Sequence, residues 1–158
     1  MGWGNPTAVL LGALVLLLVS AGIQDARVRE IANWKNAAIA LLAPLWWWSS
    51  GLSIWPDMAI QLGVALFIFA MFCVAFNFGW MGGGDVKMIG ALALWFVDWT
   101  ALAWMLIAMS LAGGALTLVM LLDQWRRKKP GTPEIPYGVA IALAALFAIR
   151  EPIINQFT

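Results

Sequence analysis

The chain has 158 residues and a net charge of +1, and its composition is 63% hydrophobic and only 11% charged. This balance excludes an ordinary soluble domain and indicates an integral membrane protein that lies in a lipid bilayer. The near-neutral charge gives no sign of nucleic-acid binding. A single cysteine, Cys73, and the lack of histidine exclude a disulfide framework and the usual zinc sites. We therefore expect no metal and no cofactor.

The first apolar segment, residues 6–24, is long enough to cross a hydrocarbon core of about 30 Å. A secretory signal would have basic residues ahead of its apolar segment. No Lys or Arg precedes residue 6, so we expect this segment to remain as a membrane span. The later apolar run of residues 86–122 contains one charge, Asp98. As one helix it would measure about 55 Å, nearly twice the bilayer core, so we expect two spans hinged near Asp98.

The sequence thus predicts an all-α, polytopic protein of one domain, residues 1–158, with about six transmembrane helices. The expected spans are 6–24, 37–48, 58–76, 85–97, 101–122 and 137–149. The fourth is short, about 20 Å. Either the membrane thins there or the helix starts below the interface.

Charge distribution supports six crossings. The loops after the first, third and fifth spans would share a side and hold eight of the nine basic residues: Arg27, Arg29, Lys35, Lys87, Arg126, Arg127, Lys128 and Lys129. The opposite side would keep only Arg150. The positive-inside rule then places these loops in the cytoplasm and both termini outside.

Two aspartates fall on the same predicted side. Asp25 follows the first span, and Asp85 precedes the fourth, directly after Gly82, Gly83 and Gly84. Paired carboxylates at the mouth of a helical bundle could share one proton and activate a water molecule. A glycine turn could also present Asp85 to an extended peptide. The alternative for Asp85 is a simple helix N-cap, and Asp57 and Asp98 fall on the other side as negative controls.

Three segments resemble the motifs of the type IV prepilin peptidases. Asp25-Ala26-Arg27 with Ile31-Ala32-Asn33 resembles their first aspartate motif, although Ala32 replaces the usual Pro. The segment from Gly82 to Lys87 resembles the Gly-x-Gly-Asp motif, and Ile135-Pro136-Tyr137-Gly138-Val139-Ala140 resembles the opening of the last span. The resemblance implies that Asp25 and Asp85 are the catalytic pair. It suggests smaller supporting roles for Gly82, Gly84, Lys87, Arg27, Asn33 and Tyr137.

For several supporting residues a plainer role stays open. Lys87 and Arg27 could tune the charge of the acids or anchor the substrate, or could merely extend toward lipid headgroups. Tyr137 could line the site or anchor the helix at the membrane interface. Gly82 and Gly84 could admit the substrate backbone or only satisfy a turn.

The resemblance implies an intramembrane aspartic endopeptidase of the bacterial inner membrane that acts at the cytoplasmic face. Its partner would be a prepilin or pseudopilin precursor, which loses a short basic leader. Full-length members carry paired Cys-x-x-Cys motifs and N-methylate the product, whereas residues 25–36 contain no Cys. The chain therefore resembles the compact, peptidase-only form of tight-adherence and Flp pili.

Two other classes of function remain as alternatives: a small ion-coupled transporter that uses Asp25 and Asp85 as ion sites, and a passive partner in pilus assembly. A transporter is expected to show repeated halves and midplane ionisable groups, and no internal repeat is visible. The sequence leaves the oligomeric state and the identity of the pilin open.

Overall fold

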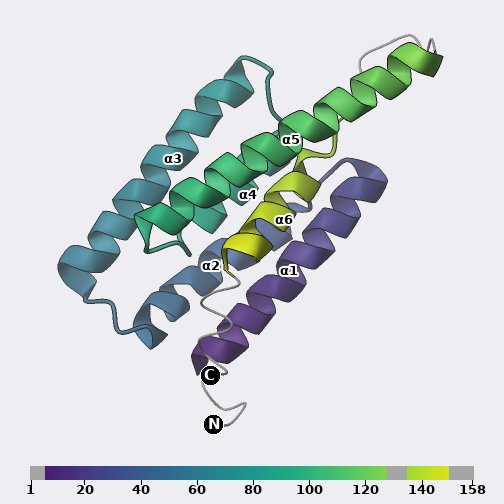
Figure 1. Ribbon diagram of the computed structural model, residues 1–158. Coiled ribbons are helices and arrows are strands. Elements are labelled where there is room, and N and C mark those ends of the chain that lie inside the picture. Colours follow the sequence, from purple (N-terminus) through teal and green to yellow (C-terminus); the bar gives the residue numbers. More distant parts are fainter. Residues whose placement is uncertain (1–5, 128–134, 150–158) are drawn as a thin grey trace.

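A computed structural model describes residues 6–127 and 135–149, and within them the chain forms a bundle of six α-helices without strands (Figure 1). An irregular helical turn, η1 (Ile54–Met58), precedes α3. The helices are α1 (Pro6–Val28), α2 (Asn33–Ser49), α3 (Ala59–Asn77), α4 (Gly83–Ala93), α5 (Trp99–Arg127) and α6 (Tyr137–Ala148). The all-α prediction is confirmed. Lys128, Lys129, Arg150 and both termini lie outside the described residues.

The helices pack as two sets of three. In one set α6 lies between α1 and α5, and in the other α4 lies between α2 and α3. The sets meet where α4 packs on α6 and where α1 packs on α2. The inner helices α4 and α6 are therefore walled in by the four longer ones, and the chain's motifs at Gly82–Asp85 and Tyr137–Gly138 lie at the beginnings of these two inner helices.

Burial explains why α4 can be short. Eight of its 11 residues are buried, so it does not have to match the thickness of the bilayer. A helix end enclosed in apolar surroundings must still satisfy its last carbonyl groups. Gln61 of α3 donates from its amide nitrogen to the carbonyls of Ala93 and Phe96 at 2.7 and 2.9 Å, and the Trp47 indole donates to that of Leu94 at 2.7 Å.

The helix bounds differ from the predicted spans in informative places. The fourth span was expected to reach Val97, but α4 ends at Ala93 and α5 begins at Trp99, so the predicted break near Asp98 is present. The first span was expected to end at residue 24, but α1 continues to Val28. Asp25 therefore lies inside the last turns of a helix and not in a loop, because helix formation does not stop where hydrophobicity does.

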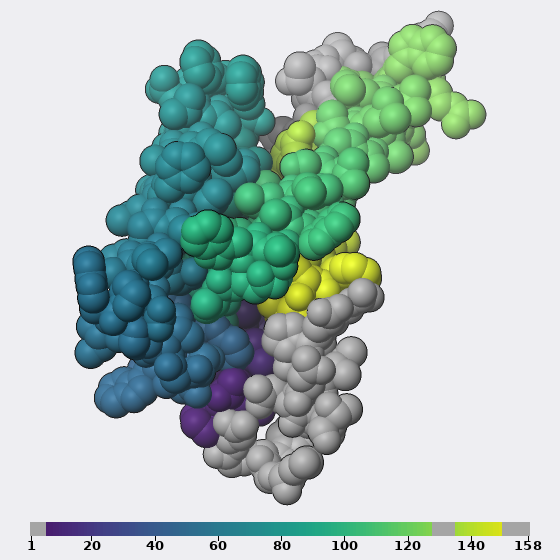
Figure 2. Space-filling view, turned by 60° about the vertical axis from the view of Figure 1, so that its left-hand side comes forward, coloured from purple at the N-terminus to yellow at the C-terminus, as the bar shows by residue number. Residues whose placement is uncertain are grey.

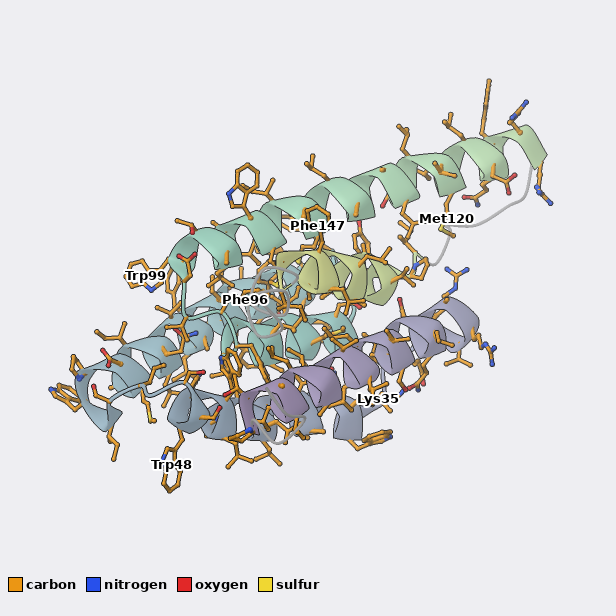
Figure 3. The ribbon with its side chains drawn as sticks, turned by 60° about the horizontal axis from the view of Figure 1, so that its bottom comes forward. Lys35, Trp48, Phe96, Trp99, Met120 and Phe147 are labelled. Atoms are coloured by element: carbon orange, nitrogen blue, oxygen red, sulfur yellow. The ribbon has the colours of Figure 1, made fainter. Side chains whose placement is uncertain are left out.

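Three described helices are long and apolar enough to cross a membrane: Pro6–Val28, Ile54–Asn77 and Trp99–Arg127. Their outer faces are rich in exposed apolar side chains, and α5 extends past its neighbours at its C-terminal end (Figures 1 and 2). Trp48 and Trp99 point outward at the end of the bundle away from Asp85 (Figure 3). This position fits the tryptophans that gather at membrane interfaces.

Candidate active site

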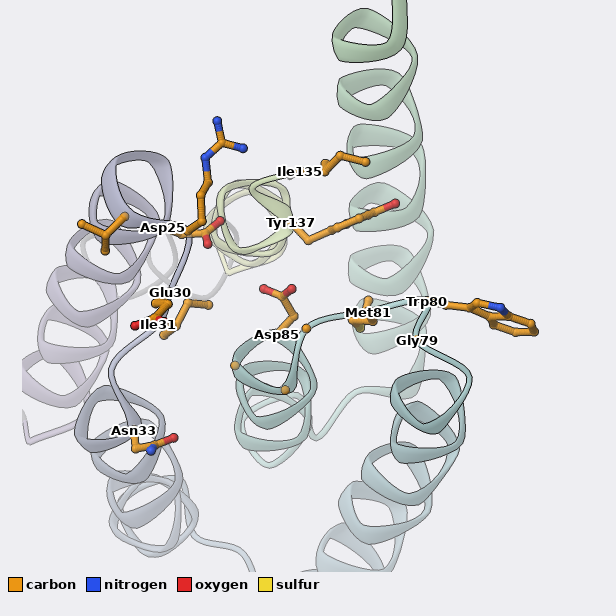
Figure 4. A pocket seen from close by; sticks show the side chains of 15 residues that line it. Asp25, Glu30, Ile31, Asn33, Gly79, Trp80, Met81, Asp85, Ile135 and Tyr137 are labelled. Carbon is orange, nitrogen blue, oxygen red and sulfur yellow. The ribbon is translucent and has the colours of Figure 1, made fainter. Parts of the chain in front are cut away.

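Asp25 and Asp85 come together in one cavity of about 800 Å³ at the end of the bundle where α1 ends and where α4 and α6 begin (Figure 4). The two carboxyl groups arrive from different helices and point into the same space. Both residues are largely shielded, with 4% and 9% of their surfaces exposed. The other lining residues are Val28, Arg29, Glu30, Ile31, Asn33, Gly79, Trp80, Met81, Gly82, Gly83, Gly84, Ile135 and Tyr137.

Asp25 is held by the N-terminus of α6, a helix more than a hundred residues away along the chain. Its Oδ2 accepts the backbone N–H of Val139 at 3.1 Å, and the Gly138 amide also donates to the carboxyl group. Pro136, the N-cap residue of α6 itself, makes no side-chain hydrogen bond to these amides. Asp25 therefore acts as the N-cap of α6 from a neighbouring helix, at a helix end where the dipole favours negative charge.

Gly138 makes this approach possible. A Cβ atom on Gly138 would lie 2.8 Å from Cγ and 2.9 Å from Oδ2 of Asp25, and 2.7 Å from Cδ1 of Ile31. All three separations are far below van der Waals contact. Only glycine lets α6 come close enough for its amides to reach the Asp25 carboxyl group.

Asp85 is held by its own helix. It is the third residue of α4 after the N-cap residue Gly82, and the Gly82 amide donates back to its carboxyl group. This is the return half of a capping box. The N-cap alternative weighed for Asp85 is therefore wrong in register, because Gly82 occupies the N-cap position and Asp85 lies three residues later, facing the cavity.

Both carboxyl groups face the same cavity, so the charge of one acts on the other. Like charges at short distance in a shielded cavity resist simultaneous ionisation, and this favours a state in which the pair holds one proton. Such a pair combines a carboxylate that can accept a proton from water with a carboxylic acid that can donate a hydrogen bond.

Asn36 of α2 supports the first turn of α4. Its side-chain nitrogen donates to the Gly84 carbonyl at 3.1 Å, and Ile31 also lies next to Gly84. This contact fixes the start of α4 against α2, and hence the position of Asp85. The sequence analysis did not single out Asn36, and its only signal there was an amide three residues after Asn33.

Tyr137 lines the cavity with its ring and binds elsewhere with its hydroxyl. The hydroxyl lies 3.1 Å from Oγ1 of Thr117, which itself donates to the Gly113 carbonyl at 2.7 Å, so Tyr137 is the donor between them. Gly113 makes room for the ring, because a Cβ there would lie 2.7 Å from Tyr137 Cε1. Tyr137 thus ties the start of α6 to α5 and forms a wall of the cavity.

The other supporting residues lie in different surroundings. Asn33 lines the cavity and accepts a hydrogen bond from Lys87 Nζ at 2.8 Å. Lys87 and Arg27 are exposed, and neither lines the aspartate cavity. Asp57 is also exposed, and its Oδ2 accepts hydrogen bonds from the amide and the hydroxyl of Ser53 at the beginning of η1.

Arg29 is a cavity residue that the motif analysis missed. It follows the last residue of α1 with a φ of 57°, a left-handed conformation in which glycine is usual, and its charge acts on Asp25. Its backbone amide donates to the Asp25 carbonyl at 2.9 Å and completes the last turn of α1. The motif resemblance singled out Arg27 and not Arg29, because which of the two arginines lines the cavity depends on where α1 ends.

Within residues 6–127 and 135–149, no group of three or more His, Cys, Asp or Glu side chains is placed to hold a metal ion. The described lining of the cavity supplies the carboxyl groups of Asp25, Asp85 and Glu30, the Arg29 guanidinium group, the Asn33 side-chain amide and backbone amides.

No match was found among curated proteins or among solved structures. The model of the type IV leader peptidase family matches residues 12–118, which is more than half of the chain and includes both cavity aspartates. The match ends before Tyr137 and Gly138. By this match the chain belongs to the type IV leader peptidase family.

Proposed function

We propose that the protein is an aspartic endopeptidase that removes the leader of prepilin or pseudopilin precursors at the cytoplasmic face of the bacterial inner membrane. The observation that carries the proposal is the meeting of Asp25 and Asp85 in one shielded cavity, each held by a helix N-terminus. Family membership supplies the class of substrate. Asp25 and Asp85 are the catalytic residues.

In the proposed reaction the pair holds one proton. The ionised carboxylate removes a proton from water, and the water oxygen attacks the scissile carbonyl carbon while the protonated partner donates to the carbonyl oxygen. The tetrahedral intermediate collapses, the C–N bond breaks, and the amine leaves with a proton from the pair. This general acid–base sequence assigns complementary tasks to the two carboxyl groups and lets them exchange roles.

The cytoplasmic location rests on charge. Basic residues gather at the end of the bundle that holds the aspartates: Arg27 and Arg29 at the end of α1, Lys35 near the start of α2, Lys87 near the start of α4, and Arg126 and Arg127 at the end of α5. Such clusters mark the cytoplasmic side. Six crossings would place all of them there, with residues 49–57 outside.

Cysteine labelling tests this orientation. In a Cys73→Ser background, Arg127→Cys should react only with a membrane-permeant thiol reagent in intact cells, and Ser50→Cys should react with an impermeant one. The reverse pattern, or both sites on one side, would contradict the proposed topology.

The activity is tested by leader cleavage in reconstituted membranes. Asp25→Asn and Asp85→Asn should each reduce turnover by about 10³-fold or more, and the double variant should be hardly slower than either single variant because parts of one catalytic unit are non-additive. Mass spectrometry of the wild-type product should show an unmethylated amino terminus, since the compact form lacks the paired cysteine motifs.

Equal amounts of membrane-inserted protein serve as the control. Substantial turnover by either Asn variant would remove that residue from the pair. Absence of cleavage by the wild type would favour the transporter or the passive assembly partner.

A further inference from the structure

A second cavity lies on the side of α4 that faces α2 and α3. It measures about 430 Å³ and forms a groove between α2 and α3 with α4 as its floor. Lys87, Gly90 and Ala91 of α4 and its C-cap residue, Leu94, line it at helical spacing. Asp85 comes two residues before Lys87, about 200° around the helix, and faces away from the groove. The two cavities share one lining residue, Asn33.

The groove is polar at one end and apolar along its length. Among the described residues, its only polar lining residues are Asn33, Asn36 and Lys87, and each comes from the first turns of α2 or α4. From Lys87 to Leu94 the helix rises about 10 Å, within the half-thickness of a bilayer core, about 15 Å. The apolar lining residues are Ala37, Ala40, Leu62, Ala65, Leu66, Phe69, Gly90, Ala91 and Leu94.

The polar end carries an unbalanced positive charge and an unused acceptor. Lys87 Nζ donates to the neutral Asn33 side chain, and among the described residues the only ion pair joins Arg127 to Asp123. Asn36 is 4% exposed, and its Oδ1 has no hydrogen-bond partner within the described part of the chain. Buried polar atoms in proteins are normally paired. This end therefore fits a ligand with an anionic group and a hydrogen-bond donor.

The lining of the groove favours a lipid chain. Small residues such as Ala40, Gly90 and Ala91 line it over a length of about 10 Å along α4, and a single acyl chain can lie along such a surface. Leu62 and Leu66 line the groove and are also exposed on the surface of the bundle, as is Leu41 of α2.

We propose that this groove is a binding site for one anionic phospholipid of the leaflet next to the active site. The phosphate pairs with Lys87, a headgroup hydroxyl donates to Asn36, and one acyl chain lies along the small residues of α2 and α4. Because Asn36 also holds the Gly84 carbonyl, the lipid contacts the back of the turn that positions Asp85. The proposal is independent of the catalytic function.

The test uses detergent-purified protein titrated with phosphatidylglycerol or phosphatidylcholine and followed by native mass spectrometry. We expect one phosphatidylglycerol per chain, bound at least tenfold more tightly than phosphatidylcholine. Lys87→Gln should weaken phosphatidylglycerol about fivefold, the effect of one basic residue at a charged membrane surface, and should leave phosphatidylcholine unchanged. Ala40→Phe should block the groove and abolish the tight site.

Matched controls are Arg126→Gln, an exposed basic residue at the same end of the bundle, and Leu41→Phe, which adds an aromatic ring to α2 outside the groove. Neither should change binding. Equal affinity for the two lipids, or unchanged binding by Lys87→Gln, would overturn the proposal. So would an Ala40→Phe protein that keeps the lipid but loses cleavage, since the groove would then hold the substrate. If Ala40→Phe does not fold, the lipid preference and Lys87→Gln still decide the question.

Discussion

The two cavity aspartates are held in similar ways by different parts of the chain. Asp85 receives the amide of Gly82, three residues before it, whereas Asp25 receives the amides of Gly138 and Val139 from a separate helix. One half of the site is thus built by local sequence, and the other exists only when α6 is docked on α1. The difference teaches that the Asp25 half depends on tertiary packing and should be the easier half to break from a distance.

The largest effect is expected at Gly138. In Gly138→Ala the new Cβ would lie within 3 Å of side-chain atoms of Asp25 and Ile31, so either α6 or the Asp25 carboxyl group must move away, and we expect Asp25 to lose its amide partners. We expect cleavage to fall by about 100-fold, a loss that a displacement near 1 Å is sufficient to cause. The measurement is cleavage by the reconstituted variant at matched protein levels.

Gly114→Ala is the control for Gly138→Ala, because a Cβ at Gly114 meets no atom within 4 Å. It should cleave like the wild type. Full activity of Gly138→Ala would show that Asp25 does not need the N-terminus of α6.

The local half should tolerate a methyl group better. In Gly82→Ala the new Cβ would lie 3.0 Å from Oδ2 of Asp85, and in Gly84→Ala it would lie 3.4 Å from Cβ of Ile31, which is ordinary contact. Gly82 is the N-cap residue of α4 and Gly84 lies in its first turn. Neither glycine has a positive φ. We expect about a tenfold loss of cleavage for Gly82→Ala and less than a twofold change for Gly84→Ala. The opposite order would mean that the substrate backbone, and not Asp85, lies against Gly84.

A similarly small effect is expected at Asp98, a capping aspartate outside the aspartate cavity. Its Oδ1 accepts the Thr100 amide at 3.0 Å and its Oδ2 accepts the Thr100 hydroxyl at 2.6 Å. Because asparagine also caps helices well, Asp98→Asn should cleave within about twofold of the wild type. Loss of cleavage would place Asp98 in the reaction.

The same variant has a defined pH dependence. The Thr100 hydroxyl and amide lower the pKa of Asp98 below 3.8. The lowered pKa stabilises the folded state above that ordinary value, and the contribution is lost as the pH falls through the lowered pKa. Thermal unfolding should therefore lose a small acid-dependent component in Asp98→Asn, and the difference between variant and wild type should be constant above about pH 5.

The sequence predicts the local half of the site far better than the assembled half. Three glycines before an acid and an apolar segment indicate a helix start, and Asp85 lies there. Gly138 entered the sequence analysis only as part of the segment that resembles the opening of the last span, because its contact with Asp25 joins residues that hydropathy and spacing do not connect. The left-handed Arg29 had no signal at all, since such a conformation usually calls for glycine.

Helix ends show the same limit. Hydropathy located the break near Asp98 but extended the fourth span to Val97, because Trp95 and Phe96 are apolar and buried although they lie outside α4. Their backbone is stabilised by side chains from other helices, such as Gln61, which binds the Phe96 carbonyl. Apolar character identifies what is buried, whereas the end of a buried helix depends on which distant donors reach its carbonyls.

The apolar packing of the two short inner helices has a consequence for the movement of protons. Beyond their first turns, the fully buried side chains of α4 and α6 are apolar: Met88, Ile89, Leu92 and Ile141. Within the described part of α4 and α6, the aspartate cavity is therefore followed by an apolar layer and not by a chain of ionisable groups. In the proposed reaction, protons exchanged by the carboxyl pair would return to the side of the membrane from which they came. The proposed hydrolysis would then proceed without discharging a proton gradient across the membrane.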